Sequence, residues 1–69
     1  MEKNLILTKA QNAVLAHDWI TAARLYKELL KDDTSNVDYL KELGSIYVKA
    51  GDDEKAIPYY EQIITFYPH

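Results

Sequence analysis

The chain contains no cysteine, and it has few residues that make turns. Without cysteine there are no disulfides, no thiolate metal ligands and no thiol nucleophile. Two glycines and two prolines in 69 residues leave little turn chemistry, which favours helices. Positive charge is also scarce, since the formal net charge is −3, whereas nucleic-acid-binding surfaces are usually basic. Nucleic acid is therefore not an expected partner.

Long hydrophobic runs are absent as well. The apolar run near the N-terminus is Leu5-Ile6-Leu7, whereas a secretory signal needs about 7–15 apolar residues and a membrane span about 20. We therefore expect no membrane partner. A cytoplasmic location is favoured, although the compartment of a longer parent chain stays open.

What is present fits one small folded domain. Apolar residues make up 48% of the chain and charged residues 28%, which is the balance of a soluble protein with a core. Domains usually run to roughly 100–150 residues, so residues 1–69 form a single domain at most.

The sequence repeats itself with a period of 34 residues. The pairs that a shift of 34 aligns include Asp18 with Asp52, Ala22 with Ala56, Tyr26 with Tyr60, Leu29 with Ile63 and Leu30 with Ile64. Each period contains two amphipathic segments with apolar residues at helical spacing. The expected helices are residues 3–16, 19–31, 37–49 and 53–66.

Caps and breakers delimit these helices. Asp18, Asp52 and either Ser35 or Asn36 are expected N-caps, and Gly51 suits the left-handed position after a helix. The buried stripe of the last helix is expected to be Ala56, Tyr60, Ile63 and Ile64. Pro58 lies past the first turn of that helix and is expected to bend it.

Residues 37–69 closely resemble a tetratricopeptide repeat. The residues that carry the resemblance are Leu40, Leu43-Gly44, Tyr47, Gly51-Asp52, Ala56, Tyr60 and Pro68, with Ile63 as the one departure from a small residue. Residues 3–36 resemble a degenerate copy with Ile6, Ala10, Asp18, Trp19, Ala22, Tyr26 and Leu29 in place. This copy departs from the pattern at Lys9, Ala13, His17 and Thr34.

The resemblance implies an all-α fold of two helix-turn-helix repeats, which form a short right-handed α-solenoid of four antiparallel helices. It also implies close helix packing where Gly44 meets Ala56. The implied function is a noncatalytic scaffold that binds a protein or peptide partner, with no enzyme activity and no cofactor.

In this family the first helix of each pair lines a concave groove that binds peptides. Carried over by position, the groove residues are Asn4, Leu7, Gln11, Val14 and Leu15, then Asp38, Lys41, Ser45, Val48 and Lys49. The Lys and Asn clamp by which one subclass holds C-terminal carboxylates is absent, because Leu7, Gln11, Lys41 and Ser45 occupy those places. The mixed lining predicts a peptide ligand with an apolar anchor and an acidic end.

Two repeats are fewer than the three or so that such arrays usually need. The chain is therefore expected to be an excerpt of a longer array, to self-associate, or to be a sufficient monomer. Self-association would use the open face of the last helix, at Tyr59, Ile63, Phe66 and Tyr67. A third functional hypothesis, an accessory piece of a larger enzyme or regulator, is not distinguished by the sequence.

Other candidate site residues favour structural roles. His17 with Asp18 is interpreted as a helix end followed by an N-cap, and His69 is isolated, since zinc usually takes three or four protein ligands. The acidic pairs Asp32-Asp33 and Asp52-Asp53 lack a calcium-loop pattern and are interpreted as turns, caps and surface. Trp19 is expected to pack over the first turn.

Overall fold

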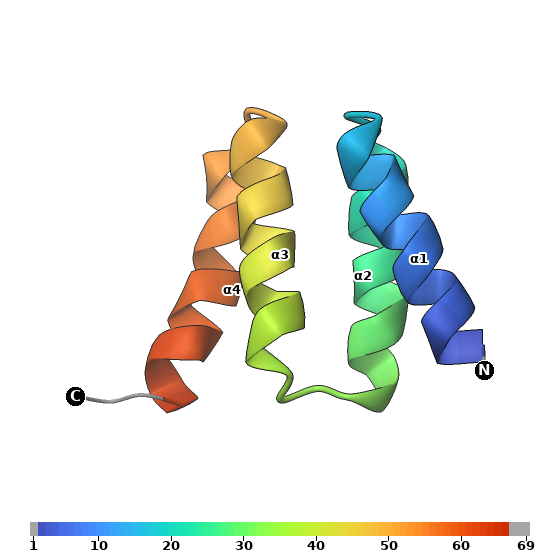
Figure 1. The fold of residues 1–69 in the computed structure, drawn as a ribbon. Coiled ribbons are helices and arrows are strands. Elements are labelled where there is room, and N and C mark those ends of the chain that lie inside the picture. Colours follow the sequence, from blue (N-terminus) through green and yellow to red (C-terminus); the bar gives the residue numbers. More distant parts are fainter. Residues whose placement is uncertain (1, 67–69) are drawn as a thin grey trace.

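The protein folds into four α-helices. The structure is a computed structural model that describes residues 2–66, and no strand occurs in that range. The helices, in the order of Figure 1, are α1 (Glu2–Leu15), α2 (Trp19–Asp32), α3 (Val37–Lys49) and α4 (Asp53–Phe66). The all-α prediction is therefore confirmed.

The helix bounds agree closely with those expected from the sequence. The third and fourth helices match the expected ranges, while α1 begins and ends one residue earlier and α2 ends one residue later. Tyr67, Pro68 and His69, which the sequence analysis used, lie outside the described residues.

Both hairpins turn through the same hydrogen-bonded geometry, 34 residues apart. After α1, the Asp18 backbone N–H donates to the Ala13 carbonyl at 2.8 Å; after α3, Asp52 donates to Tyr47 at 2.8 Å. The residue before each donor has a positive φ, 59° at His17 and 82° at Gly51. These are the bonds and the left-handed residue of a Schellman helix end. His17 thus takes up the backbone conformation that glycine provides in the second hairpin.

Side-chain caps begin three of the helices. The Asp18 carboxylate accepts from the Thr21 backbone N–H at 3.3 Å, and Asp52 accepts from Lys55 at 3.3 Å. Asn36, rather than Ser35, caps α3, since its side-chain oxygen accepts from the Tyr39 N–H at 3.1 Å. Each cap supplies a partner for a backbone donor that the first helical turn leaves free.

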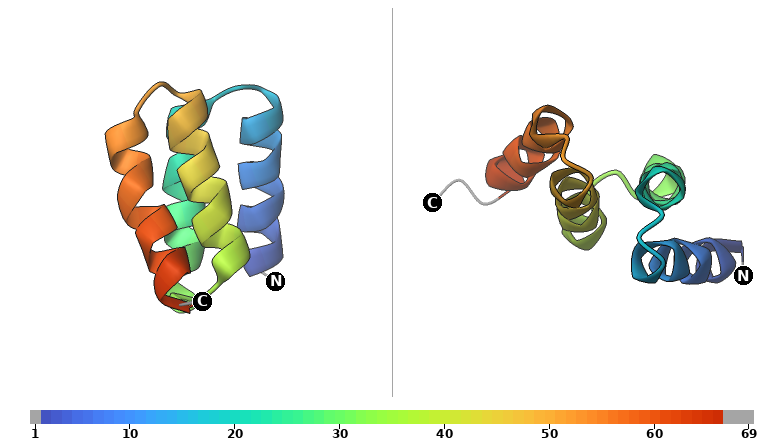
Figure 2. Two further views of the ribbon diagram at one scale, coloured as in Figure 1. Left: turned by 90° about the vertical axis from the view of Figure 1, so that its left-hand side faces the viewer. Right: turned by 90° about the horizontal axis from the view of Figure 1, so that it is seen from above.

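The two hairpins stand side by side and make two opposite faces. Figure 2 shows α1 and α3 on one face and α2 and α4 on the other. The α2 helix packs against both α1 and α3, so it joins the hairpins into one stack. This is a short α-solenoid of two helical hairpins. Every described helix falls short of the length and apolar character that a membrane crossing requires.

The core runs through both hairpins. Its most buried members are Ala10, Ala22, Leu29, Leu40, Leu43, Ile46 and Ala56. Small residues at 10 and 22 permit the close approach of α1 and α2.

The α3–α4 contact is close at Gly44, as expected, but its nearest neighbour is Tyr60 rather than Ala56. A Cβ atom placed on Gly44 would lie 2.7 Å from Tyr60 Cζ and 2.9 Å from Cε1 and Cε2. The ring of Tyr60 therefore occupies the space that any larger side chain at 44 would need.

Pro58 lies inside α4, and the helix continues through it to Phe66. Its ring removes one backbone donor, yet apolar residues on both sides remain in helical register. The bend expected at Pro58 stays a prediction.

Candidate functional site

A groove of about 720 Å³ lies between α1 and α3, and we call it the α1–α3 groove. Five of the ten residues expected from the sequence line it, namely Leu7, Gln11, Val14, Leu15 and Asp38. Leu7 and Val14 are half-buried, whereas Leu15 is 80% exposed. The groove therefore offers apolar side chains that a bound partner would cover.

Tyrosine forms the floor of this groove. Tyr26 comes from α2, which lies behind α1 and α3, and only 3% of its surface is exposed. Its ring packs against Tyr39 with the centroids 6.0 Å apart and the planes tilted by 55°. Burial, with smaller effects from Glu42 and Tyr39, raises the pKa of Tyr26 above its ordinary value. The phenol is therefore neutral at physiological pH.

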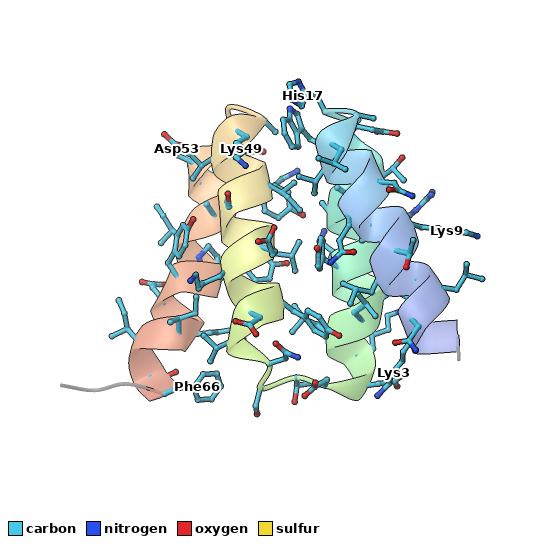
Figure 3. The ribbon with its side chains drawn as sticks, viewed as in Figure 1. Lys3, Lys9, His17, Lys49, Asp53 and Phe66 are labelled. Atoms are coloured by element: carbon cyan, nitrogen blue, oxygen red, sulfur yellow. The ribbon has the colours of Figure 1, made fainter. Side chains whose placement is uncertain are left out.

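The charge of the groove differs from the expected one. Asp38 and Glu42 line it, whereas Lys41 and Lys49 do not. Figure 3 shows Lys49 at the end of α3 near His17, and its ammonium group lies 5.8 Å from the Trp19 ring centroid. The groove is thus acidic rather than basic.

The other expected residues are spread over neighbouring surface. Asn4 and Val48 are exposed and Ser45 is half-buried, and none of the three lines the groove. The sequence analysis missed four lining residues, which are Tyr26, Asn36, Tyr39 and Glu42. The spacing of Asp38 and Glu42, four residues apart on one helix, was the available signal for an acidic edge.

Asn36 organises the end of the groove. Its Nδ2 group donates to the Asp33 carboxylate at 2.9 Å, while its Oδ1 caps α3. Asp33 and Asp52 thus act in a turn and in a cap, as expected. Among residues 2–66 there is no cluster of three or more His, Asp or Glu side chains that could hold a metal ion.

Trp19 packs over the first turn, which confirms its expected role. The His17 ring stacks on it with centroids 5.1 Å apart and planes 16° from parallel. This contact compensates His17 for the left-handed backbone that it adopts without being glycine.

The open face of α4 is made of other residues than those expected. Tyr59 and Ile63 are half-buried, and Tyr59 stacks on Tyr47 at 5.8 Å. Tyr67 lies outside the described residues. The exposed apolar residues are Ile57, Tyr60, Ile64 and Phe66. The expectation that Tyr60 and Ile64 belong to the buried stripe is therefore wrong.

The 34-residue shift explains this exposure. Ala23 and Tyr26 on α2 are 5% and 3% exposed because α3 covers them, whereas their equivalents Ile57 and Tyr60 on α4 are 53% and 38% exposed. In the described part of the chain, no helix packs on α4 in the way that α3 packs on α2. The exposed set Ile57, Tyr60 and Ile64, spaced for one helix face, is called the α4 outer face below.

Comparison with known proteins identifies part of the chain. The family model described as tetratricopeptide repeat matches residues 40–65, from α3 into α4. Repeats of this family generally mediate protein–protein interaction and are typically noncatalytic. No curated protein and no solved structure matches the chain.

Proposed function

We propose that this chain, in which residues 40–65 form a tetratricopeptide repeat, is a noncatalytic scaffold module that binds a peptide in the α1–α3 groove. The observation that carries the proposal is the lining of the groove. Leu7, Val14 and Leu15 present apolar surface beside the Tyr26 floor, and carboxylates mark one edge. An extended peptide with an aliphatic anchor and a neighbouring Lys or Arg complements this surface.

Residues 1–69 act as one domain in this proposal, with residues 3–36 as a degenerate first repeat. The equivalent turns at His17 and Gly51 and the equivalent caps at Asp18 and Asp52 support it. The first helix of this degenerate repeat supplies most of the apolar side of the groove.

The proposed ligand charge departs from the one that the sequence suggested. An acidic peptide end would meet Asp38 and Glu42 rather than a lysine, and like charges at close range weaken binding. A basic residue beside the anchor avoids this repulsion.

Two fluorescein-labelled peptides test the proposal. One is Gly-Leu-Lys-Leu-Lys-Gly, and the other carries Glu in place of Lys. We expect the basic peptide to shift the amide signals of Leu7, Gln11 and Asp38 in ¹⁵N-labelled protein. Substitution of Leu15→Ser should weaken its binding roughly fivefold, since about 1 kcal/mol of apolar contact is lost.

The matched control is Ile20→Ser, an exposed aliphatic residue that does not line this groove. Its affinity for the basic peptide should stay at the wild-type value. Equal losses in the two variants, or signal shifts that favour the acidic peptide at the α1–α3 groove, would refute the proposal.

The α4 outer face supports a second candidate function, self-association. Exposed apolar residues at helical spacing mark an interface. Head-to-tail stacking is disfavoured, because α1 carries Lys9 and Asn12 where α3 carries the buried Leu43 and Ile46. Figure 3 shows Lys9 pointing outward from α1. A two-fold pairing of α4 with α4 of a second copy avoids burying these polar groups.

Sedimentation against protein concentration tests this second candidate. If α4 pairs with α4, Ile64→Glu should abolish the dimer without unfolding the monomer, since Ile64 is 64% exposed. Leu5→Glu, at the opposite end of the stack, is the control and should leave the dimer intact. A wild-type chain that stays monomeric at all concentrations would reject self-association.

A further inference from the structure

A second groove lies on the opposite face, between α2 and α4, and we call it the α2–α4 groove. It has a volume of about 370 Å³ and adjoins a further hollow of about 280 Å³. Lys27, Tyr47 and Lys55 line both. Figure 2 shows that α2 and α4 form the face away from α1 and α3, so this groove is separate from the proposed peptide site.

Tyr47 on α3 forms the floor of the second groove. It is buried, and Tyr59 stacks against it. The Lys27 and Lys55 ammonium groups lie 5.4 and 5.9 Å from the centroid of its ring, within the range of cation–π attraction. A side-chain hydrogen bond with Tyr47 raises the pKa of Lys27 above its ordinary value, so Lys27 is charged at neutral pH.

Positive charge is concentrated here in a protein of negative net charge. Arg24, Lys27 and Lys55 line the groove, against the single acidic residue Asp52. Asp52 is already engaged, because its carboxylate pairs with Lys55 at 3.6 Å and caps α4. Within residues 2–66, Arg24 and Lys27 form no ion pair, so both retain charge for a ligand.

An apolar rim adjoins the cations. Ile20 is 86% exposed, and the half-buried Trp19 lies next to it at the start of α2. An isolated exposed isoleucine beside a tryptophan offers contact area for one aliphatic side chain. The groove thus combines an anion-binding part with an apolar part.

We propose that the α2–α4 groove binds an acidic segment of a partner protein, with carboxylates on Arg24 and Lys27 and an aliphatic side chain against Ile20 and Trp19. Charge complementarity selects this partner, since the opposite groove carries Asp38 and Glu42 and the same ligand would be repelled there. The planar guanidinium of Arg24 suits a carboxylate, which it can bind through two parallel hydrogen bonds.

The acidic peptide Gly-Leu-Glu-Leu-Glu-Gly tests this assignment. It should shift the amide signals of Ile20, Ala23 and Lys27 in the wild-type protein, and Arg24→Gln/Lys27→Gln should weaken its binding roughly tenfold or more. The matched control is Lys9→Gln/Lys41→Gln, which removes the same charge outside the groove. It should lower the affinity less than about twofold, because exposed distant charges are screened by salt.

Circular dichroism melts of both double variants establish that they fold, and signal shifts of the basic peptide at the α1–α3 groove should be unchanged in each. An equal loss of acidic-peptide affinity in the two double variants would reduce the effect to net charge and overturn the proposal. Selective displacement by inorganic phosphate, at an ionic strength matched with sodium chloride, would assign the groove to small oxyanions and also overturn it. Failure of the basic peptide alone would reject the α1–α3 site and leave this one standing.

Discussion

Replacement of Gly44 by alanine tests the contact that fixes the spacing of α3 and α4. A Cβ atom at this position would lie 2.7 Å from Tyr60 Cζ, so the ring has to move. Overpacking of this kind costs about 1–3 kcal/mol, and the lower end applies because Tyr60 is 38% exposed and can shift outward. Alanine also stabilises the helix by about 0.8–1.0 kcal/mol relative to glycine. The two effects nearly cancel, and we expect a net loss of about 0–1 kcal/mol.

The same substitution in a Tyr60→Ala background separates the two effects. Without the ring, only the helix propensity remains, so Gly44→Ala should now stabilise the protein by about 0.8–1.0 kcal/mol. Urea unfolding of the four proteins gives the coupling free energy directly. A Gly44→Ala effect of equal size in both backgrounds would show that Tyr60 does not constrain Gly44, and would refute the packing argument.

Three further predictions follow from the same contacts. Substitution of His17→Gly should leave the protein about 1 kcal/mol more stable than His17→Ala in urea titrations, because only glycine relieves the left-handed strain at φ 59°. Substitution of Leu43→Ala, at a fully buried site, should cost about 2–5 kcal/mol, whereas the exposed Leu5→Ala should change stability by less than about 0.5 kcal/mol. Burial raises the pKa values of Tyr26 and Tyr59, so their contribution to stability is present below about pH 10 and is lost as the pH rises through the folded-state pKa; urea midpoints at rising alkaline pH should fall, and less so in Tyr26→Phe.

The helices and their ends could be predicted from the sequence because their causes are local. An aspartate or asparagine three residues before a free backbone donor caps a helix wherever the helix packs. The 34-residue shift then transfers the geometry of the Gly51 turn to His17, although the side chains differ.

Exposure on α4 could not be predicted in the same way, because it depends on what packs next. Tyr26 and Tyr60 occupy equivalent positions with equivalent neighbours in sequence, and both have the pattern of a core residue. Only the presence of α3 over α2, and the lack of such a helix over α4 among the described residues, makes one buried and the other exposed. Periodicity gives the face of a helix but not whether that face is covered.

Groove charge was inaccessible for a different reason, which is the rotation of each helix. Successive residues on a helix point about 100° apart, so Glu42 enters the α1–α3 groove while its neighbour Lys41 does not. The same rotation divides α2, where Tyr26 forms the floor of one groove and Lys27 lines the other.

This division has a consequence for how a two-hairpin scaffold works. Because α2 lies behind the α1–α3 groove and beside the α2–α4 groove, one helix contributes to two surfaces of opposite charge on opposite faces. A single extended ligand cannot satisfy both, since its carboxylates would be repelled at Asp38 and its ammonium groups at Lys27. The arrangement therefore suits two partners of opposite charge held at once, with the stacked hairpins as the spacer between them. Selection between the partners then comes from repulsion at the wrong groove as much as from attraction at the right one.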